Sequence, residues 1–138
     1  MIKTVTNSVE ETEALGEEFA RGLKPGSVVA LYGELGAGKT AFVRGIAKGL
    51  KVEANVKSPS FTIINEYKGG SLPLYHIDLY RLEGKESIEH LGLEEYVYSN
   101  GVCVIEWAER AEHVLPENAV KVVLLYDGDG RRRIDLAA

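Results

Sequence analysis

The stretch that decides the fold of this chain is Gly33-Glu34-Leu35-Gly36-Ala37-Gly38-Lys39-Thr40. Its pattern, G-x-x-x-x-G-K-[S/T], is that of a P-loop, whose backbone amides surround the phosphates of a nucleotide. The glycines let the backbone come close to phosphate oxygens. Lys39 is expected to place a charge between the β- and γ-phosphates, and Thr40 to offer its hydroxyl to Mg²⁺. The stretch therefore predicts a bound nucleoside triphosphate with magnesium.

The segments on either side of this loop favour a P-loop over a structural glycine-rich turn with an incidental lysine. Residues 27–32 are a short apolar run, typical of a strand that is buried on both faces of a parallel sheet. From residue 38 to 50 the pattern becomes helical, with Phe42, Ile46 and Leu50 on one face. The first turn of that helix offers unpaired N–H groups and the positive end of the helix dipole to an anion.

The rest of the chain predicts further strands and short helices. An S-x-x-E capping box at residues 8–11 begins a helix with an apolar stripe at Leu15, Phe19 and Leu23, which residues 24–26 end. The other predicted helical segments are residues 86–98, broken by Gly92, and residues 108–114. The other predicted strands are a short edge strand at the N-terminus and residues 61–67, 72–80, 101–106, 119–126 and 131–136.

This order of elements predicts an α/β fold of the three-layer P-loop NTPase type. Helices that alternate with buried strands require a parallel sheet centre, while hairpins at residues 69–70 and 127–130 supply antiparallel strands at the margins. No repeat or linker interrupts the 138 residues, so we expect one nucleotide-binding domain spanning residues 1–138.

Composition narrows the classes of protein to which the chain can belong. Apolar residues make up 45% and charged residues 27%, no apolar run approaches the roughly 20 residues of a membrane span, and the N-terminal residues do not have the apolar core expected of a secretory signal. We therefore expect a soluble, cytoplasmic protein. A net charge of -5 argues against a broad surface for nucleic acid. The only cysteine, Cys103, lies in an apolar run and is expected to be a buried, inert thiol.

Two acids lie at the ends of predicted strands, where a P-loop site needs carboxylates for magnesium or for a positioned water. Asp78 ends an alternating strand and Glu106 ends a buried one. Each could instead be a solvated or capping residue. Thr62 lies in a loop that could offer a hydroxyl to magnesium or the γ-phosphate, or it could follow a plain β-turn. His76 is expected to be a hydrogen-bonded structural residue rather than a base.

Two clusters of basic residues are expected, by default, to lie on solvent-exposed faces. The first comprises Arg44, Lys48 and Lys51, toward the end of the P-loop helix, where cations suit the dipole. The second is Arg131-Arg132-Arg133 in the last predicted hairpin. A contact of these arginines with a partner or with RNA is the alternative.

Taken together, several segments resemble the TsaE (YjeE) family, small bacterial P-loop ATPases of tRNA threonylcarbamoyladenosine synthesis. The resemblance spans nearly the whole chain. It rests on the capped first helix, the P-loop, Ser58-Pro59-Ser60-Phe61-Thr62, His76-Ile77-Asp78-Leu79-Tyr80-Arg81 and Val104-Ile105-Glu106-Trp107.

The resemblance implies a function for each of these segments. It implies ATP and Mg²⁺ as ligands, with the nucleotide bound by residues 33–41, including Ala41, and by Trp107. Lys39, Asp78 and Glu106 would be the functional residues of hydrolysis, and the metal ligands would come from Thr40, Thr62 and the two acids. Which acid serves the metal and which the water stays open.

The resemblance also implies partners, which residue patterns cannot supply. TsaB- and TsaD-type proteins would carry out threonylcarbamoyl transfer to a tRNA adenosine next to the anticodon, and tRNA would be met only through that complex. With arginines as scattered as Arg81 and Arg110, ATP hydrolysis by the isolated chain is expected to be slow. The alternatives are a small-molecule kinase and a regulatory module switched by nucleotide binding.

Overall fold

The computed structural model describes residues 2–34, 37–53, 64–82 and 84–137. In this part of the chain seven strands form one sheet. The strands are β1 (Ile2–Thr6), β2 (Val28–Tyr32), β3 (Ile64–Tyr67), β4 (Leu74–Asp78), β5 (Val102–Glu106), β6 (Val120–Tyr126) and β7 (Arg132–Ala137). The helices are α1 (Val9–Ala20), α2 (Lys39–Gly49), α3 (Lys85–His90), α4 (Leu93–Val97) and the 3₁₀ helix η1 (Ala108–Val114).

The sheet is mixed and has a parallel centre. Its strand order is β1-β7-β6-β2-β5-β4-β3. The central strands β6, β2, β5 and β4 are parallel, whereas β1, β7 and β3 pair antiparallel with their neighbours. The predicted sheet is thus confirmed. Because carboxyl ends of parallel strands meet at one edge, the residues that follow β2, β4 and β5 lie together.

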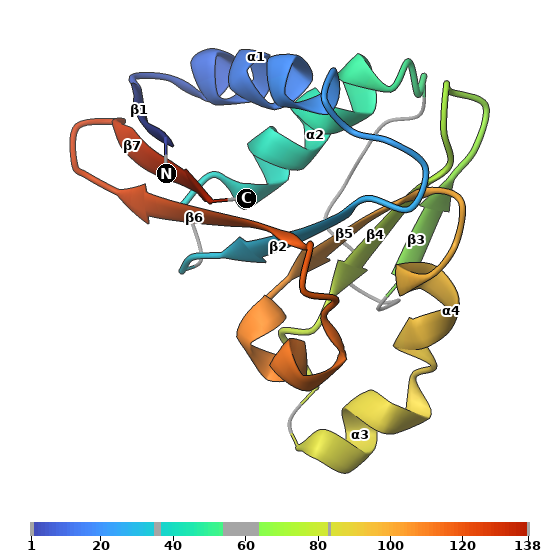
Figure 1. Cartoon of the computed structure of the whole chain (residues 1–138). Coiled ribbons are helices and arrows are strands. Elements are labelled where there is room, and N and C mark those ends of the chain that lie inside the picture. Colours follow the sequence, from blue (N-terminus) through green and yellow to red (C-terminus); the bar gives the residue numbers. More distant parts are fainter. Residues whose placement is uncertain (1, 35–36, 54–63, 83, 138) are drawn as a thin grey trace.

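Helices cover both faces of the sheet. Figure 1 shows α1 and α2 on one face and α3, α4 and η1 on the other. Each face has its own apolar core: Leu31 and Val104 pack with Ile46 of α2, while Ala30 and Ile105 face the second cluster. Every residue of β5 is buried, which explains why its sequence is a continuous apolar run. The predicted three-layer arrangement is confirmed.

Helix α1 begins where the capping box predicts. The Ser8 hydroxyl accepts a hydrogen bond from the amide of Glu11 at 3.1 Å. The returning bond differs from the standard box, because the Glu11 carboxylate accepts from the amide of Asn7, at 3.3 Å, rather than from that of Ser8. The helix ends at Ala20, earlier than the predicted stop at residues 24–26, and turns join it to β2.

Helices α1 and α2 touch backbone to backbone. A Cβ atom on Gly45 of α2 would lie 1.9 Å from the carbonyl oxygen of Glu13, and one on Gly16 of α1 would lie 2.3 Å from that of Phe42. Only glycine fits at such a contact. Helix α1 therefore fixes the position of α2, the helix that follows the P-loop.

The other predicted elements are present within the described residues, most with bounds that differ by one or two residues, and the predicted helical piece at residues 108–114 is the 3₁₀ helix η1. Of the strand predicted at residues 61–67, the structure describes only the part from Ile64, and the preceding residues lie outside the described ranges. Gly92, with φ 72°, separates α3 from α4, as predicted. No helix in the described ranges is both long and apolar enough to cross a membrane.

Candidate nucleotide site

The P-loop connects β2 to α2, in the strand–loop–helix order that its sequence predicts. Of its eight residues, Leu35 and Gly36 lie outside the described part. Gly33 passes close to β6, because a Cβ atom there would lie 2.5 Å from the carbonyl oxygen of Leu124. The start of the loop is therefore pressed against the strand next to β2, and a side chain at Gly33 would displace it.

Gly38 makes the sharp turn from the loop into α2. It is the N-cap of α2 and has φ 97°, in the left-handed region that favours glycine. Among the described residues no side chain caps this helix end, and the first amide to bond back is that of Phe42, to the Gly38 carbonyl at 3.0 Å. The amides of Lys39, Thr40 and Ala41 precede that bond and form the end of the helix that attracts anions.

The Lys39 side chain is buried at this helix end. The residue is 5% exposed, and its Nζ atom has no hydrogen-bond partner among the described residues. The ammonium lies over the Trp107 ring, 4.2 Å from the ring centroid. Burial lowers the pKa of Lys39, an effect that the nearby charges of Glu106 and Asp78 oppose. A buried cation without an acceptor at a helix N-terminus is suited to binding an anion.

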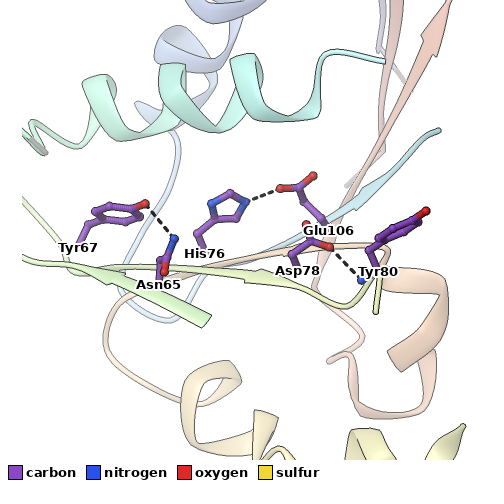
Figure 2. A network of polar contacts seen from close by, with 6 residues as sticks. All are labelled: Asn65, Tyr67, His76, Asp78, Tyr80 and Glu106. Carbon is purple, nitrogen blue, oxygen red and sulfur yellow. Dashed lines mark hydrogen bonds and ion pairs between the residues drawn. The ribbon is translucent and has the colours of Figure 1, made fainter. Parts of the chain in front are cut away.

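The two predicted acids lie side by side at the carboxyl edge of the sheet. Asp78 ends β4, Glu106 ends β5, and the two residues are register partners in the parallel pair. Both act on the charge of Lys39, so the structure brings the acids and the P-loop lysine together. Oδ1 of Asp78 accepts a hydrogen bond from the amide of Tyr80 at 2.9 Å, which orients the carboxylate (Figure 2).

Glu106 has a buried partner, His76. Figure 2 shows the two side chains pointing toward each other beneath a helix, and Nε2 of His76 lies 2.5 Å from Oε2 of Glu106. His76 is fully buried and Glu106 is 3% exposed. Because a carboxylate can only accept, the imidazole N–H donates. The prediction that His76 is a hydrogen-bonded structural residue is consistent with this contact, but sequence reasoning did not identify Glu106 as its partner.

A signal for this pair was present in the sequence. His76 and Asp78 are two residues apart on one strand and therefore face the same side of the sheet. Glu106 lies two residues after Val104 on β5, so its side chain points to the same face of the sheet as that of Val104, which packs in the core beneath α1 and α2. Recognising β4 and β5 as parallel neighbours would have placed all three polar side chains on the face that carries α2.

Aromatic residues enclose the site beyond Glu106. Trp107 has a left-handed backbone, φ 58°, as it turns from β5 into η1. Its ring centroid lies 5.0 Å from that of Tyr80, which is 44% exposed. Trp107 thus contacts both the P-loop lysine and the segment that follows Asp78.

Arg110 holds the segment after β4 in place. Its Nη1 atom donates to the carbonyl oxygens of Leu79, Tyr80 and Leu82, at 3.2, 2.5 and 2.7 Å. Its guanidinium carbon lies 5.4 Å from the centroid of the Trp107 ring. Arg110 therefore has a structural task in this state, and it joins the segments that follow the two acids.

The remaining predicted residues separate into different environments. Thr62 lies outside the described residues. The cluster at the end of α2 matches the solvated-face interpretation in part, since Arg44 and Lys48 form ion pairs with Glu13 of α1, the Arg44 contact at 3.6 Å. The ion pair with Lys48 is the largest cause that lowers the pKa of Glu13. In the arginine run, Arg132 lies beside the P-loop, which the sequence reasoning missed.

The chemistry of these residues suits a polyanion together with a divalent metal ion. Main-chain amides and the Lys39 ammonium supply positive charge. Thr40, Asp78 and Glu106 supply the hard oxygen donors that Mg²⁺ prefers, with the remaining positions left to phosphate oxygens and water. These residues therefore fit a magnesium–nucleotide complex.

Comparisons with known proteins agree with this geometry. Residues 6–134 match the family model described as "Threonylcarbamoyl adenosine biosynthesis protein TsaE". The tRNA threonylcarbamoyladenosine biosynthesis protein TsaE of Bacillus subtilis (strain 168) is 47% identical over 137 residues, which cover 99% of this chain and 85% of the relative. The protein of the same name from Treponema pallidum (strain Nichols) is 45% identical, and the match covers 99% of this chain and 100% of the relative.

A solved structure is similar over nearly the same length. The crystal structure of YdiB from Bacillus subtilis superposes with a TM-score of 0.84 at 44% sequence identity. The match covers 96% of this chain and 82% of that chain. The arrangement of strands and helices around the candidate site is therefore shared with a protein whose structure has been determined.

Proposed function

This chain belongs to the TsaE family and has its role in tRNA threonylcarbamoyladenosine biosynthesis, and from that premise we propose that it binds and hydrolyses Mg-ATP. One P-loop domain spanning residues 1–138 would carry the activity, in the cytoplasm. The observation that carries the proposal is the buried Lys39 ammonium, which has no acceptor among the described residues and lies at the N-terminus of α2 with two carboxylates nearby.

The phosphates would be held by residues 33–41. Backbone amides at the start of α2 would surround the β-phosphate, and Lys39 would leave the Trp107 ring for the β- and γ-phosphate oxygens. This exchange would give the ammonium the acceptors that none of the described residues supplies. Trp107 would stay close to the nucleotide as the neighbour of Lys39.

The metal would be held by Thr40 together with an acid from β4 or β5. Bound Mg²⁺ would neutralise charge that develops on the transferred phosphoryl group. Asp78 and Glu106 are close enough in register to divide the tasks of metal ligand and water orientation between them. His76 supports Glu106 in either task by fixing one of its oxygens. Thr62, as a further ligand, belongs to the same proposal.

Partner proteins of the TsaB and TsaD type would complete the site. Hydrolysis needs positive charge at the γ-phosphate, and a supplied arginine can accelerate such reactions about a thousandfold or more. In the described structure Arg110 donates to three carbonyl groups of its own chain. The isolated protein should therefore turn over slowly, and the partners would carry out threonylcarbamoyl transfer to tRNA.

The test is a reconstituted tRNA modification assay with the Lys39→Ala chain. We expect ATP hydrolysis and multiple-turnover modification to fall at least about a hundredfold, because the variant lacks the positive charge that Lys39 would place beside the β- and γ-phosphates. Lys48→Ala is the matched control, since Lys48 lies on the same helix but is exposed and paired with Glu13. Full multiple-turnover activity of Lys39→Ala would contradict the ATPase role.

A second variant separates hydrolysis from binding. Glu106→Ala should bind ATP but release little phosphate, with or without partners. If it still supported many cycles of modification, a nucleotide-dependent binding module would replace the ATPase. If phosphorylated small molecules appeared with the wild-type chain, a kinase would replace it.

A further inference from the structure

The three successive arginines of the β6–β7 hairpin have different surroundings. Arg133 and Asp135 lie on one face of β7 and form an ion pair at 3.6 Å, with the Arg133 side chain 48% exposed. Arg132 shares its parity with Ile134, which is buried in the core beneath α1 and α2. Arg132 is therefore the member of the run that faces the P-loop side of the sheet.

Arg132 reaches the turn that begins α2. A Cβ atom on Gly38 would lie 3.5 Å from Nε of Arg132, so that nitrogen borders the last glycine of the P-loop. The guanidinium carbon lies 4.4 Å from the centroid of the Tyr126 ring, and Nη1 donates weakly to the Arg131 carbonyl at 3.3 Å. The stacking on Tyr126 orients the guanidinium before any ligand is present.

Nε of Arg132 is buried and has no hydrogen-bond partner among the described residues. A buried donor without an acceptor is costly, and since none of the described residues supplies one, a bound ligand could serve as the acceptor. Lys39 Nζ is in the same condition. These two buried cationic nitrogens border a single loop, and the guanidinium belongs to β7, on the opposite side of β2 from Glu106 and Trp107.

The two cations indicate the direction in which a nucleotide lies. Lys39 and the acids Asp78 and Glu106 mark the β5 side of the loop, where the γ-phosphate and metal belong under the proposed function. The rest of the phosphate chain must then extend from the P-loop toward β6 and β7, where Arg132 lies. We propose that Arg132 binds the α-phosphate of the nucleotide, the phosphate next to the nucleoside.

This assignment rests on the proposed function, because it takes a nucleoside polyphosphate as the ligand. It also favours a ligand contact for Arg132 over the solvated face or the partner or RNA contact considered for the arginine run. The buried Nε of Arg132 lies beside Gly38 of the P-loop, whereas a protein or RNA docked on the outside of the hairpin would meet the exposed Arg133 first.

The experiment measures binding of Mg-ATP and Mg-ADP to the full chain by calorimetry. Arg132→Met removes the donors and keeps the length of the side chain, Arg132→Lys keeps the charge, and Arg133→Met is the matched control. We expect Arg132→Met to weaken ATP and ADP equally, by about tenfold to a hundredfold, the loss of a hydrogen bond between charged groups. Arg132→Lys should restore part of the affinity, and Arg133→Met should match wild type.

A spectroscopic measurement separates a phosphate contact from mere support of the loop. In ³¹P spectra of bound ADP, Arg132→Lys should shift the α-phosphorus resonance and leave the β-phosphorus resonance in place. Loss of loop structure would shift the β resonance, because the loop amides surround that phosphate.

Three results would overturn the assignment. They are wild-type affinity in Arg132→Met, an equal loss in Arg133→Met, and a shift confined to the β resonance. If the wild-type chain bound neither nucleotide, the proposed function would fail as well. Normal wild-type binding with an unaffected Arg132→Met chain would remove only the role of Arg132.

Discussion

Replacing His76 by leucine should destabilise the fold through Glu106. The Glu106 carboxylate is 3% exposed, and the His76 imidazole, 2.5 Å away, is fully buried. Removing the hydrogen-bond partner of a buried polar group costs about 1 to 3 kcal/mol, and more when that group is charged. Replacing both partners by apolar groups is much less damaging. We therefore expect His76→Leu to lose about 3 kcal/mol, and His76→Leu/Glu106→Leu to recover at least about half of that loss.

Urea unfolding followed by circular dichroism measures this difference. For a chain of this size the dependence of the free energy of unfolding on urea is about 2 kcal/mol per molar, so the midpoint should fall by about 1.5 M in His76→Leu. His90→Leu is the control, because His90 is exposed and its replacement should change the stability by less than about 0.5 kcal/mol. Additive losses in the double variant, or a loss below about 1 kcal/mol in His76→Leu, would refute the reasoning.

Three further predictions concern packing, charge and the thiol. Gly45→Ala should lose at least about 2 kcal/mol in thermal unfolding, because the new methyl would overlap the Glu13 carbonyl, whereas Gly22→Ala, whose nearest neighbour is 3.8 Å away, should be neutral. The pKa of Glu13 is lowered by Lys48, so its ion pairs stabilise the fold above pH 4.5 and are lost as the pH falls through the folded pKa. Glu13→Gln should thus be less stable than wild type at neutral pH, with a difference that salt reduces and that vanishes in acid; a difference independent of pH would contradict this. Burial raises the pKa of Cys103 to about 12, so a thiol reagent at pH 8 should react only after denaturant is added, and rapid labelling of the native chain would contradict its burial.

Local patterns predicted much of the fold because its main elements have strong local signals. The Ser8 capping box, the apolar repeat from Phe42 to Leu50 and the break at Gly92 each depend on residues close in sequence. The bounds of α1 were less predictable. Leu15, Phe19 and Leu23 all pack against the core, but the helix ends at Ala20, and a turn carries Leu23 to its place.

The missed contacts depend on pairing between distant segments. Asp78 and Glu106 could be predicted individually from the ends of their strands, but the contact between His76 and Glu106 requires β4 and β5 to be parallel neighbours in a particular register. Arg132 was missed for a related reason. The charge run suggested one surface, although alternation along β7 separates its members between two faces of the sheet.

The Lys39 ammonium, which no described residue accepts, has a consequence for how this chain can change over evolutionary time. Its burial lowers its own pKa, which means that the folded state is less favourable for the charged form than water is. Methionine at position 39 would lie over the Trp107 ring without that cost. Selection for folding alone would therefore favour methionine, and under the proposed function the lysine would be retained because it binds the phosphates. Under the proposed function, stability and activity would therefore oppose each other at this position.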